Sequence, residues 1–533
     1  MPPVTSFLIR SRLRNRVSLA VELLLSNLRP TRGISQGTDD LLVNVGAVKM
    51  VAAAAVSSSC TQLTHENADF LVNALEGVGI RPFLVDYSGQ SLSFGIDLAH
   101  RADALTALEA CSDSPGWYLH WFDGPGSGTV SLTTASRSAR VRNARQWRIY
   151  RLVALGERGL GYEQAAEVTF WELGSSGAME LVGTRGLERF DPRSTPTIET
   201  VEGFDYPGNT GFPVEKDLAR FSEPVDIVLT WVDGSEEAWK RDFNLWRDRG
   251  GPTISDSAIA QARFAHHDEL RYALRSIWLY CGWARNIYLV TADQTPIWLR
   301  ENAGVTLVSH RDILPATALP TFNSHAIEAA LHRIPGLAEH FVYFNDDVMA
   351  GRALRPETFF SPNGLAKSFP SRARTPSIHH PDSPSFDAAA MRGNELLDSA
   401  VGKVATHKPD HVPHPQRRST SEDLSDRFND EVNATMHSKF RSQQDISVAA
   451  SFAQHYGVAL GTSIFGEITS CYTSLSSDRL PWYLDEIEMT RSYDSFCINE
   501  SGVHTADKSH NQALAAAFLE RYFPVSAPWE NGL

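Results

Sequence analysis

The stretch Phe341-Val-Tyr-Phe-Asn-Asp-Asp-Val-Met349 joins an apolar run to a cluster of polar residues. Its first four residues predict a buried β-strand, because a short uninterrupted apolar run suits a strand covered on both faces. Asn345, Asp346 and Asp347 follow where that strand should end. Adjacent carboxylates raise the cost of ionising each other, and a divalent cation with oxygen ligands would offset that cost. A polar turn without a metal is the alternative for this stretch.

The same pattern occurs three more times in the second half of the chain. Val225–Val232, Asn286–Thr291 and Val305–Ser309 are apolar runs, and each ends at or near an aspartate. Helical patterns at Asp268–Tyr280 and Ser324–Ile334 lie between these strands. Strands that alternate with helices predict an α/β fold with a mostly parallel sheet, in which ligands bind beyond the carboxyl ends of the strands. We therefore expect the four strand ends to share one site.

Composition limits the classes of partner. The chain has 533 residues, 42% hydrophobic and 21% charged, with a net charge of −14. Because no basic excess is available to neutralise phosphates, nucleic acid is excluded as the main partner. The five cysteines are odd in number and form no C-x-x-C motif, which disfavours a disulfide framework and a zinc site. A reducing compartment, and hence a cytoplasmic location, is expected.

The first residues leave three alternatives open. Arg10, Arg12, Arg14 and Arg16 precede Val17–Leu25. This segment fits a surface helix on anionic lipid, a solvated tail, or an upstream extension of a chain that starts at Met50. No run reaches the ~18 apolar residues that a membrane-spanning helix needs. Peripheral contact with the inner face of the membrane is thus one of the expectations.

Changes in composition divide the chain into five parts. Residues 61–220 contain strand and helix patterns of an α+β domain, and their last part, 185–220, is rich in proline and glycine like a linker. Residues 361–435 are rich in Pro, Ser and His, as in a loop that covers a site. We predict a mobile N-terminal segment (1–60), a smaller α+β domain with its linker (61–220), the first part of a catalytic α/β domain (221–360), a helical insertion or lid (361–435), and the C-terminal part of the catalytic domain (436–533).

Four blocks in the second half carry a family resemblance. They run from Asp226 to Gly234, from Asp268 to Thr291, from Leu319 to Met349, and from Phe440 to Asn499. Together they resemble the Stealth family of sugar-1-phosphate transferases, and the ending Leu519-Glu-Arg-Tyr-Phe-Pro524 is most similar to actinobacterial exopolysaccharide phosphotransferases. The resemblance implies a GT-A-like catalytic domain. It also implies transfer of a hexose-1-phosphate, N-acetylglucosamine-1-phosphate, from a UDP-sugar to a hydroxyl of a cell-surface polysaccharide, with release of UMP.

Candidate site residues follow from the strand ends and from the resemblance. Arg271 and Arg275 lie one helical turn apart, where they bind phosphate or pair with neighbouring acids. His414 belongs to the block His411-Val-Pro-His414, and Glu500 departs from the aspartate that is usual after Asn499. The expected catalytic residues are His414, Asp347, Glu328 and Arg441; the expected substrate contacts are Asp233, Gly234, Arg271, Arg275 and Asn345; the expected ligands of Mg²⁺ or Mn²⁺ are Asp346, Asp347 and Asn499.

Two other functions remain open at the level of sequence. A metal-dependent glycosyltransferase would share the fold and the aspartates but would release UDP. A non-catalytic glycan-binding protein would need none of the catalytic residues. The expected partners are a UDP-sugar donor and a polysaccharide acceptor, and a homodimer is a further expectation. The nucleotide product, UMP or UDP, separates the two enzymes.

Overall fold

The computed structural model describes residues 41–45, 48–53, 58–183, 188–250, 268–300, 303–378, 380, 383–500 and 508–531. The arginine-rich segment singled out in the sequence lies outside these residues. The chain divides into two compact units between Asp217 and Leu218. No helix in the described ranges is long and apolar enough to cross a membrane.

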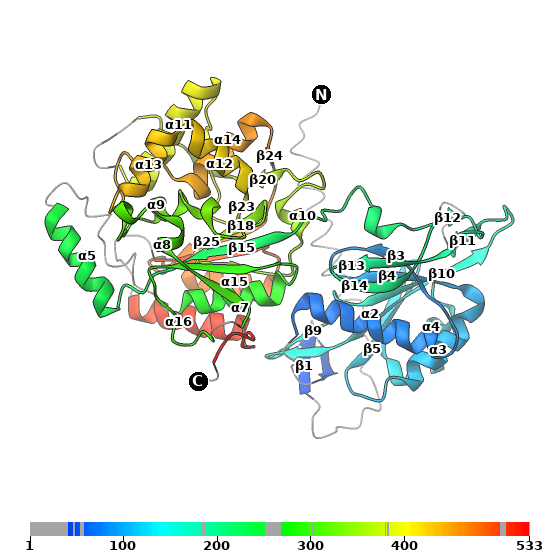
Figure 1. Ribbon diagram of the computed structural model, residues 1–533. Coiled ribbons are helices and arrows are strands. Elements are labelled where there is room, and N and C mark those ends of the chain that lie inside the picture. Colours follow the sequence, from blue (N-terminus) through cyan, green and yellow to red (C-terminus); the bar gives the residue numbers. More distant parts are fainter. Residues whose placement is uncertain are drawn as a thin grey trace, which may run out of the picture. The chain divides into compact units, whose positions relative to one another are not determined.

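The first unit is built on an eight-stranded sheet, in which β10 lies between β7 and the parallel strand β4 (Figure 1). Helices α2 and α3 contribute Leu71, Leu75 and Leu108 to a buried core that also contains Trp147 and Phe170 from the strands. Its helices and strands are β1 (Leu41–Val45), β2 (Val48–Ala52), α2 (Cys60–Glu76), β3 (Phe83–Tyr87), β4 (Leu92–Asp97), α3 (Arg101–Ala110), β5 (Trp117–Asp123), β6 (Gly126–Ser131), α4 (Ala139–Asn143), β7 (Gln146–Arg151), β8 (Val153–Leu155), β9 (Arg158–Leu160), β10 (Ala166–Leu173), β11 (Met179–Leu181), β12 (Arg189–Phe190), β13 (Pro196–Val201) and β14 (Phe204–Asn209).

Two segments that we expected from the sequence to be a mobile segment (1–60) and a linker (185–220) contain strands of this unit. Strands β1 and β2 pair with each other, and β1 also pairs with β9, so the expected mobile segment 1–60 contains ordered strands. In the expected linker, β13 and β14 form a hairpin whose turn residues Glu202 and Gly203 both have positive φ. Such turns match the twist of the flanking strands. Val201 and Tyr206 of this hairpin reach the core, which a linker would not do.

The second unit is built on a five-stranded sheet of order β17-β16-β15-β18-β23. The first four strands are parallel and β23 is antiparallel to β18, which confirms the predicted α/β fold with a mostly parallel sheet. Its helices and strands are β15 (Val225–Thr230), α5 (Glu237–Gly250), α7 (Glu269–Tyr280), β16 (Ile287–Thr291), β17 (Val305–Ser309), α8 (His310–Ile313), α9 (Ser324–Glu328), β18 (His340–Asn345), β19 (Val348–Ala350), α10 (Pro356–Phe359), β20 (Ala366–Ser368), β21 (Pro370–Arg374), α11 (Ser385–Val401), β22 (His407–Pro409), β23 (His414–Arg417), α12 (Arg418–Arg427), α13 (Asn429–His437), α14 (Ala453–Leu460), β24 (Ser463–Phe465), β25 (Ser470–Ser474), α15 (Leu480–Thr490), β26 (Ser495–Asn499) and α16 (Lys508–Tyr522).

Helices cover both faces of this sheet. Figure 1 shows α9 and α11–α14 on one face and α7, α15 and α16 on the other. The core of the first face joins strand residues such as Val228 and Phe341 to Leu424, Met436 and Phe452 of the helices. Strands β15, β16 and β18 are buried almost throughout, as their continuous apolar runs require when both faces are covered.

Residues 361–435, expected to form a helical insertion or lid, contribute a strand and core residues to the second unit. Strand β23 completes the sheet at its edge, in register with β18 so that His414 pairs with Tyr343. Helices α11, α12 and α13 of the same segment contribute Leu396, Leu424 and Val432 to the buried core. Each of these helices buries one apolar face in the core over the sheet. The segment is therefore part of the second unit.

A three-stranded sheet brings β26, from the C-terminal part of the chain, to the residues that follow β18. Strand β26 lies between β19 and β25, with Cys497 opposite Val348 and Tyr472. Because β19 begins directly after Asp347, this pairing sets β26 beside the two adjacent aspartates.

Candidate active site

The parallel strands end together at one edge of the five-stranded sheet. Thr230, the last residue of β15, is in register with Val290 of β16 and with Asn345 of β18. The segments that follow these strands therefore start at the same level. Asp233, Asp346 and Asp347 lie in them, as expected from the sequence.

Asp347 has polar neighbours from two distant segments. Its Oδ2 accepts hydrogen bonds from Asn499 Nδ2 at 2.7 Å and from Cys497 Sγ at 3.3 Å. His411 Nε2 lies 3.5 Å from its Oδ1. Burial acts to raise the pKa of Asp347, but His411 and the two hydrogen bonds hold it below its ordinary value. Burial and the nearby Asp347 carboxylate raise the pKa of the Cys497 thiol well above its ordinary value.

Asp346 and Asn345 complete a set of oxygen atoms suited to a cation. Burial and the charge of Asp347 raise the pKa of Asp346 well above its ordinary value. Within the described residues, the side-chain oxygen of Asn345 and Oδ1 of Asp347 are buried and make no hydrogen bond. Asp347, His411 and Cys497 also lie close enough together to hold an ion. A set of carboxylate and amide oxygens suits a hard cation such as Mg²⁺, whereas a set with thiolate and imidazole would favour Zn²⁺.

The two histidines of the block His411–His414 occupy different environments. His411 is 31% exposed and faces Asp347. Burial acts to lower the pKa of His411, but Asp347 raises it above its ordinary value. His414 is only 2% exposed, with Nδ1 2.8 Å from the Gln454 amide nitrogen, and burial lowers its pKa to about 3. The base role expected for His414 stays a prediction, and this burial disfavours it.

Glu328 is the last residue of α9, and its carboxylate lies at the start of another helix. Its carboxylate accepts hydrogen bonds from Ser447 Oγ at 3.1 Å and from the Ala450 N–H at 3.4 Å. These two groups lie at the start of the π-helical turn Val448–Phe452, which continues into α14. A negative charge is stabilised at this end of a helix, and π-helical turns are frequent at functional sites.

Tyr343 lies close enough to Glu328, Arg441 and Asp346 for their charges to act on its phenol. Burial raises the pKa of the Tyr343 phenol well above its ordinary value, and the charges of Glu328, Asp346 and Arg441 all act on it. Arg441 donates from Nη2 and Nε to Ser324 Oγ, at 2.5 and 3.2 Å. Burial lowers the pKa of Arg441, with Glu328 acting in the opposite direction. Of the expected residues, Glu328, Asp346 and Arg441 thus lie within electrostatic range of one phenol.

Arg271 and Arg275 pair with an acid, one of the two alternatives for them, but this acid lies far along the chain. Arg275 is buried and makes two hydrogen bonds to the Glu530 carboxylate, at 2.7 and 2.8 Å, and one to the Phe523 carbonyl oxygen. Arg271 Nε donates to the same carboxylate at 2.6 Å. The two arginines therefore bind a carboxylate of the C-terminal segment in place of phosphate, because their helix packs against that segment.

Asp233 and Gly234 form a turn at the shared edge of the sheet. Asp233 Oδ1 accepts from the Ser235 N–H at 2.7 Å. The Asp233 N–H donates to the Gln294 side-chain oxygen at 2.9 Å, and Gln294 donates back to the Asp233 carbonyl. Their expected contact with substrate stays a prediction.

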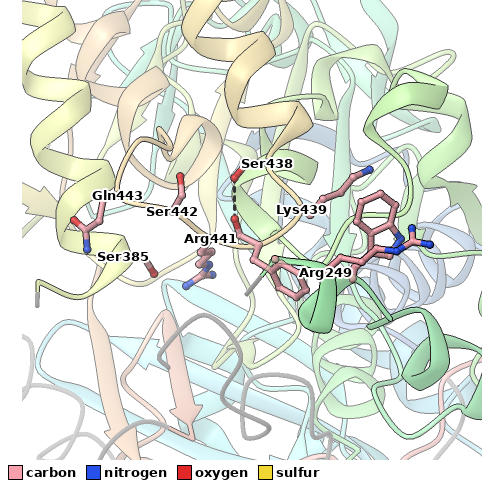
Figure 2. Close-up of a pocket in the computed structure, with 10 residues that line it drawn as sticks. Arg249, Ser385, Ser438, Lys439, Arg441, Ser442 and Gln443 are labelled. Carbon is pink, nitrogen blue, oxygen red and sulfur yellow. Dashed lines mark hydrogen bonds between the residues drawn. The ribbon is translucent and has the colours of Figure 1, made fainter. Parts of the chain in front are cut away.

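A pocket of about 470 Å³ lies beside Arg441. Figure 2 shows its lining side chains, among them Arg249 from α5 and Lys439 and Arg441 from the segment after α13. The pocket is lined by the candidate site residue Arg441 and contains none of the residues around Asp347.

Sequence reasoning missed His411 and Cys497. A signal for Cys497 was present in Phe496-Cys-Ile-Asn499, because residues two apart in a strand point to the same face. Cys497 therefore follows from Asn499 once this stretch is read as a strand. For His411 the sequence offered only its closeness to His414, which does not say which of the two faces the aspartates.

Comparisons with known proteins agree on one family. Three sequence profiles match: Stealth protein CR2, conserved region 2, at residues 263–368; CR3, conserved region 3, at 410–457; and CR4, conserved region 4, at 485–532. An exopolysaccharide phosphotransferase of Streptomyces coelicolor is 33% identical over 551 residues, covering 93% of this chain and 88% of the relative. Exopolysaccharide phosphotransferase CpsY of Mycobacterium tuberculosis is 32% identical over 476 residues, covering 87% of this chain and 88% of the relative.

Among solved structures, the galactosyltransferase LgtC in complex with donor and acceptor sugar analogues matches with a TM-score of 0.27 and 10% identity, covering 55% of this chain and 95% of LgtC. The relatives extend over nearly the whole chain, and the conserved regions include Asp346, Asp347, His411, Arg441 and Asn499. The chain belongs to the Stealth family, together with the exopolysaccharide phosphotransferases of actinobacteria.

Proposed function

We propose that this chain transfers a sugar-1-phosphate from a UDP-sugar to a hydroxyl of a polysaccharide, with release of UMP. The names of the relatives support a phosphotransferase that acts on exopolysaccharide. The observation that carries the proposal is the meeting of Asp346, Asp347 and His411 at the carboxyl edge of the parallel sheet. This edge is where α/β sheets bind their ligands.

The oxygen atoms at this edge fit a divalent cation. Asp346 and Asp347 would hold it, with Asn345 or Asn499 as further ligands, because Asp347 Oδ1 and the Asn345 side-chain oxygen make no hydrogen bond within the described residues. The positive charge would also offset the repulsion that raises the pKa of Asp346. When bound, Mg²⁺ or Mn²⁺ neutralises charge on the phosphates of the donor.

In this proposal His411 takes the proton of the acceptor hydroxyl. Its Nε2 lies 3.5 Å from Asp347 Oδ1, and Nδ1 would accept the proton of the incoming hydroxyl. The hydroxyl oxygen forms a bond to the phosphorus that carries the sugar, the bond from this phosphorus to the UMP oxygen breaks, and the hydroxyl proton passes to the imidazole. UMP leaves with the electron pair of the broken bond.

Arg441 and Glu328 act on the transferred group in this proposal. The Arg441 guanidinium suits phosphate oxygens because its donors form a planar fork. Ser324 orients this guanidinium, and the Glu328 charge lies close enough to act on it. Glu328 itself is held by the first turn of the helix that leads into α14, which leaves it a fixed contact for the sugar.

One product assay tests the proposal. The protein is incubated with UDP-N-acetylglucosamine, Mg²⁺ and a polysaccharide acceptor, and the nucleotide product is identified. Release of UMP together with a new phosphodiester on the acceptor is expected, and excess chelator should stop both. Release of UDP would instead establish a glycosyltransferase that attacks the sugar carbon. Full activity in chelator, or restoration by Zn²⁺ alone, would contradict the oxygen-ligand site.

A further inference from the structure

The pocket beside Arg441 contains a buried ammonium group without a hydrogen-bond partner. Lys439 Nζ makes no hydrogen bond within the described residues, although an ammonium group carries three donors. It lies 4.7 Å from the centre of the Trp246 ring. A cation is attracted to the face of an aromatic ring, but this contact leaves all three donors unsatisfied. Burying such a group is unfavourable unless a ligand completes it.

The rest of the pocket is positively charged. Its ten lining residues include Arg249, Lys439 and Arg441 and no carboxylate. Arg249 lies at the end of α5, with its guanidinium 5.3 Å from the centre of the same Trp246 ring. The Trp246 ring thus contacts two cations, Arg249 and Lys439, both of which line the pocket.

Three polar side chains in the pocket already donate hydrogen bonds elsewhere. Ser438 Oγ donates to the Phe440 carbonyl oxygen, Ser442 Oγ donates to Asp445, and the Gln443 amide donates to the Ser383 carbonyl oxygen. None of these groups meets the need of the Lys439 ammonium. A ligand for this pocket must therefore bring its own acceptor oxygens and negative charge.

We propose that Lys439 and Arg249 bind a phosphate group of a substrate in this pocket. A phosphate offers several acceptor oxygens and the charge that the pocket lacks. Arg441, to which the proposed function gives the transferred phosphate, also lines this pocket, whereas no residue of the Asp347 cluster does. The inference rests on the proposed function for its two sources of phosphate: the nucleotide that leaves the donor, or a phosphodiester already present in the acceptor polysaccharide.

Binding of inorganic pyrophosphate to the full chain tests the site without turnover. Trp246 reports on occupancy, and loss of the fluorescence change in Trp246→Phe would assign the signal. We expect Lys439→Gln and Arg249→Gln each to weaken pyrophosphate binding by about tenfold or more, since hydrogen bonds to charged groups contribute ~1.5–3 kcal/mol. Lys439→Arg should restore most of it. Lys240 lies on α5, as Arg249 does; it pairs with Glu237 and is 41% exposed. Lys240→Gln is therefore the matched control. Unchanged affinity in Lys439→Gln would overturn the proposal.

Steady-state kinetics then separate the two sources. A raised KM for the UDP-sugar in Lys439→Gln, with an unchanged KM for the acceptor, assigns the pocket to the leaving nucleotide. The opposite result assigns it to a phosphodiester of the acceptor. Unchanged KM values for both substrates would overturn the proposal even if pyrophosphate binds. If the wild-type chain releases no UMP but binds pyrophosphate through Lys439, the proposed function fails and the phosphate pocket stands.

Discussion

Asp347 is the side chain on which the polar contacts of the candidate active site meet. Asn499 and Cys497 reach it from β26, and His411 reaches it from the residues before β23. Asp347 lies in the two-residue turn between β18 and β19, so its backbone is held on both sides. A side chain fixed in this way is preorganised, and catalysis by fixed charges depends on such preorganisation.

Replacement of Asp347 by Asn should remove transfer while keeping the fold. The change removes one negative charge from the edge of the sheet, for which we expect a loss of at least ~10²-fold in UMP release. The urea midpoint should change little, because Asp347→Asn also relieves the repulsion with Asp346. Rates and urea midpoints of the wild type and the variant check both parts.

Asp293→Asn is the matched control for that variant. Asp293 lies beyond β16 at the same edge of the sheet and pairs with Ser309 and Arg311. It should keep nearly full activity. Equal losses in Asp293→Asn and Asp347→Asn would mean that the general negative charge of the edge matters, and that Asp347 has no particular role.

The two histidines near β23 give a second test at the residue scale. His411→Gln should lower UMP release by ~10²–10⁴-fold, the usual contribution of a positioned proton acceptor. His414→Gln should lower the rate far less and should mainly reduce stability, because His414 is buried against Gln454 and Tyr343. Rates and unfolding free energies of both variants decide the assignment. A reversed order of the two rates would return the base role to His414.

The sequence predicts the acidic part of this site better than its histidine. Asp346 and Asp347 follow an apolar run, and the ends of parallel strands meet at one edge, so their location follows from strand physics. The choice between His411 and His414 depends on how β23 pairs with β18. That pairing puts His414 opposite Tyr343 and leaves His411 beyond the end of the strand. Nothing local in four residues specifies such a long-range register.

At the scale of elements, the segment 361–435 shows why composition misleads. Its prolines and serines are typical of a loop, yet β23 contains Pro415 and closes the edge of the sheet. An edge strand tolerates proline, because one row of its backbone groups needs no partner strand. The helices that follow bury Leu424 and Val432. The average composition of these helices is polar. It therefore does not reveal that each helix has one apolar face, which packs in the core.

The contact between α7 and Glu530 supports a prediction about stability. Glu530→Gln should destabilise the second unit by ~3–5 kcal/mol, because it leaves the buried Arg275 guanidinium without its carboxylate. Urea unfolding measures the loss. Glu520 is 59% exposed and lies 3.5 Å from Arg275, so Glu520→Gln should cost no more than ~1 kcal/mol. Equal effects of the two variants would show that the burial of Glu530 contributes nothing.

At the scale of the whole molecule, buried neutral histidines predict a loss of stability in acid. Burial lowers the pKa of His120, His310 and His332 to about 4, from an ordinary value near 6.5. Between pH 6.5 and 4 the unfolded chain therefore binds more protons than the folded chain, and the folded state loses stability as the pH falls. Each group contributes up to ~1.4 kcal/mol per pH unit in this range.

Urea unfolding at pH 7 and at pH 5 checks this expectation. The free energy of unfolding should be lower at pH 5, and His332→Gln should reduce the difference between the two pH values. Stability that is equal or higher at pH 5 would contradict the low pKa values.

The order of folding during synthesis follows from the Glu530 contact. Arg275 pairs with a carboxylate that is 255 residues further along the chain, and β19 pairs with β26. Neither partner has been synthesised when Arg275 and β19 leave the ribosome. While the ribosome is still making the residues between them, the first unit has every strand of its sheet available, whereas the second has a buried guanidinium and an open strand edge. Long-range contacts of this kind slow folding. Until they form, the chain populates intermediates that expose apolar surface and tend to aggregate. A nascent chain stalled before Glu530 should therefore depend on chaperones for its second unit only.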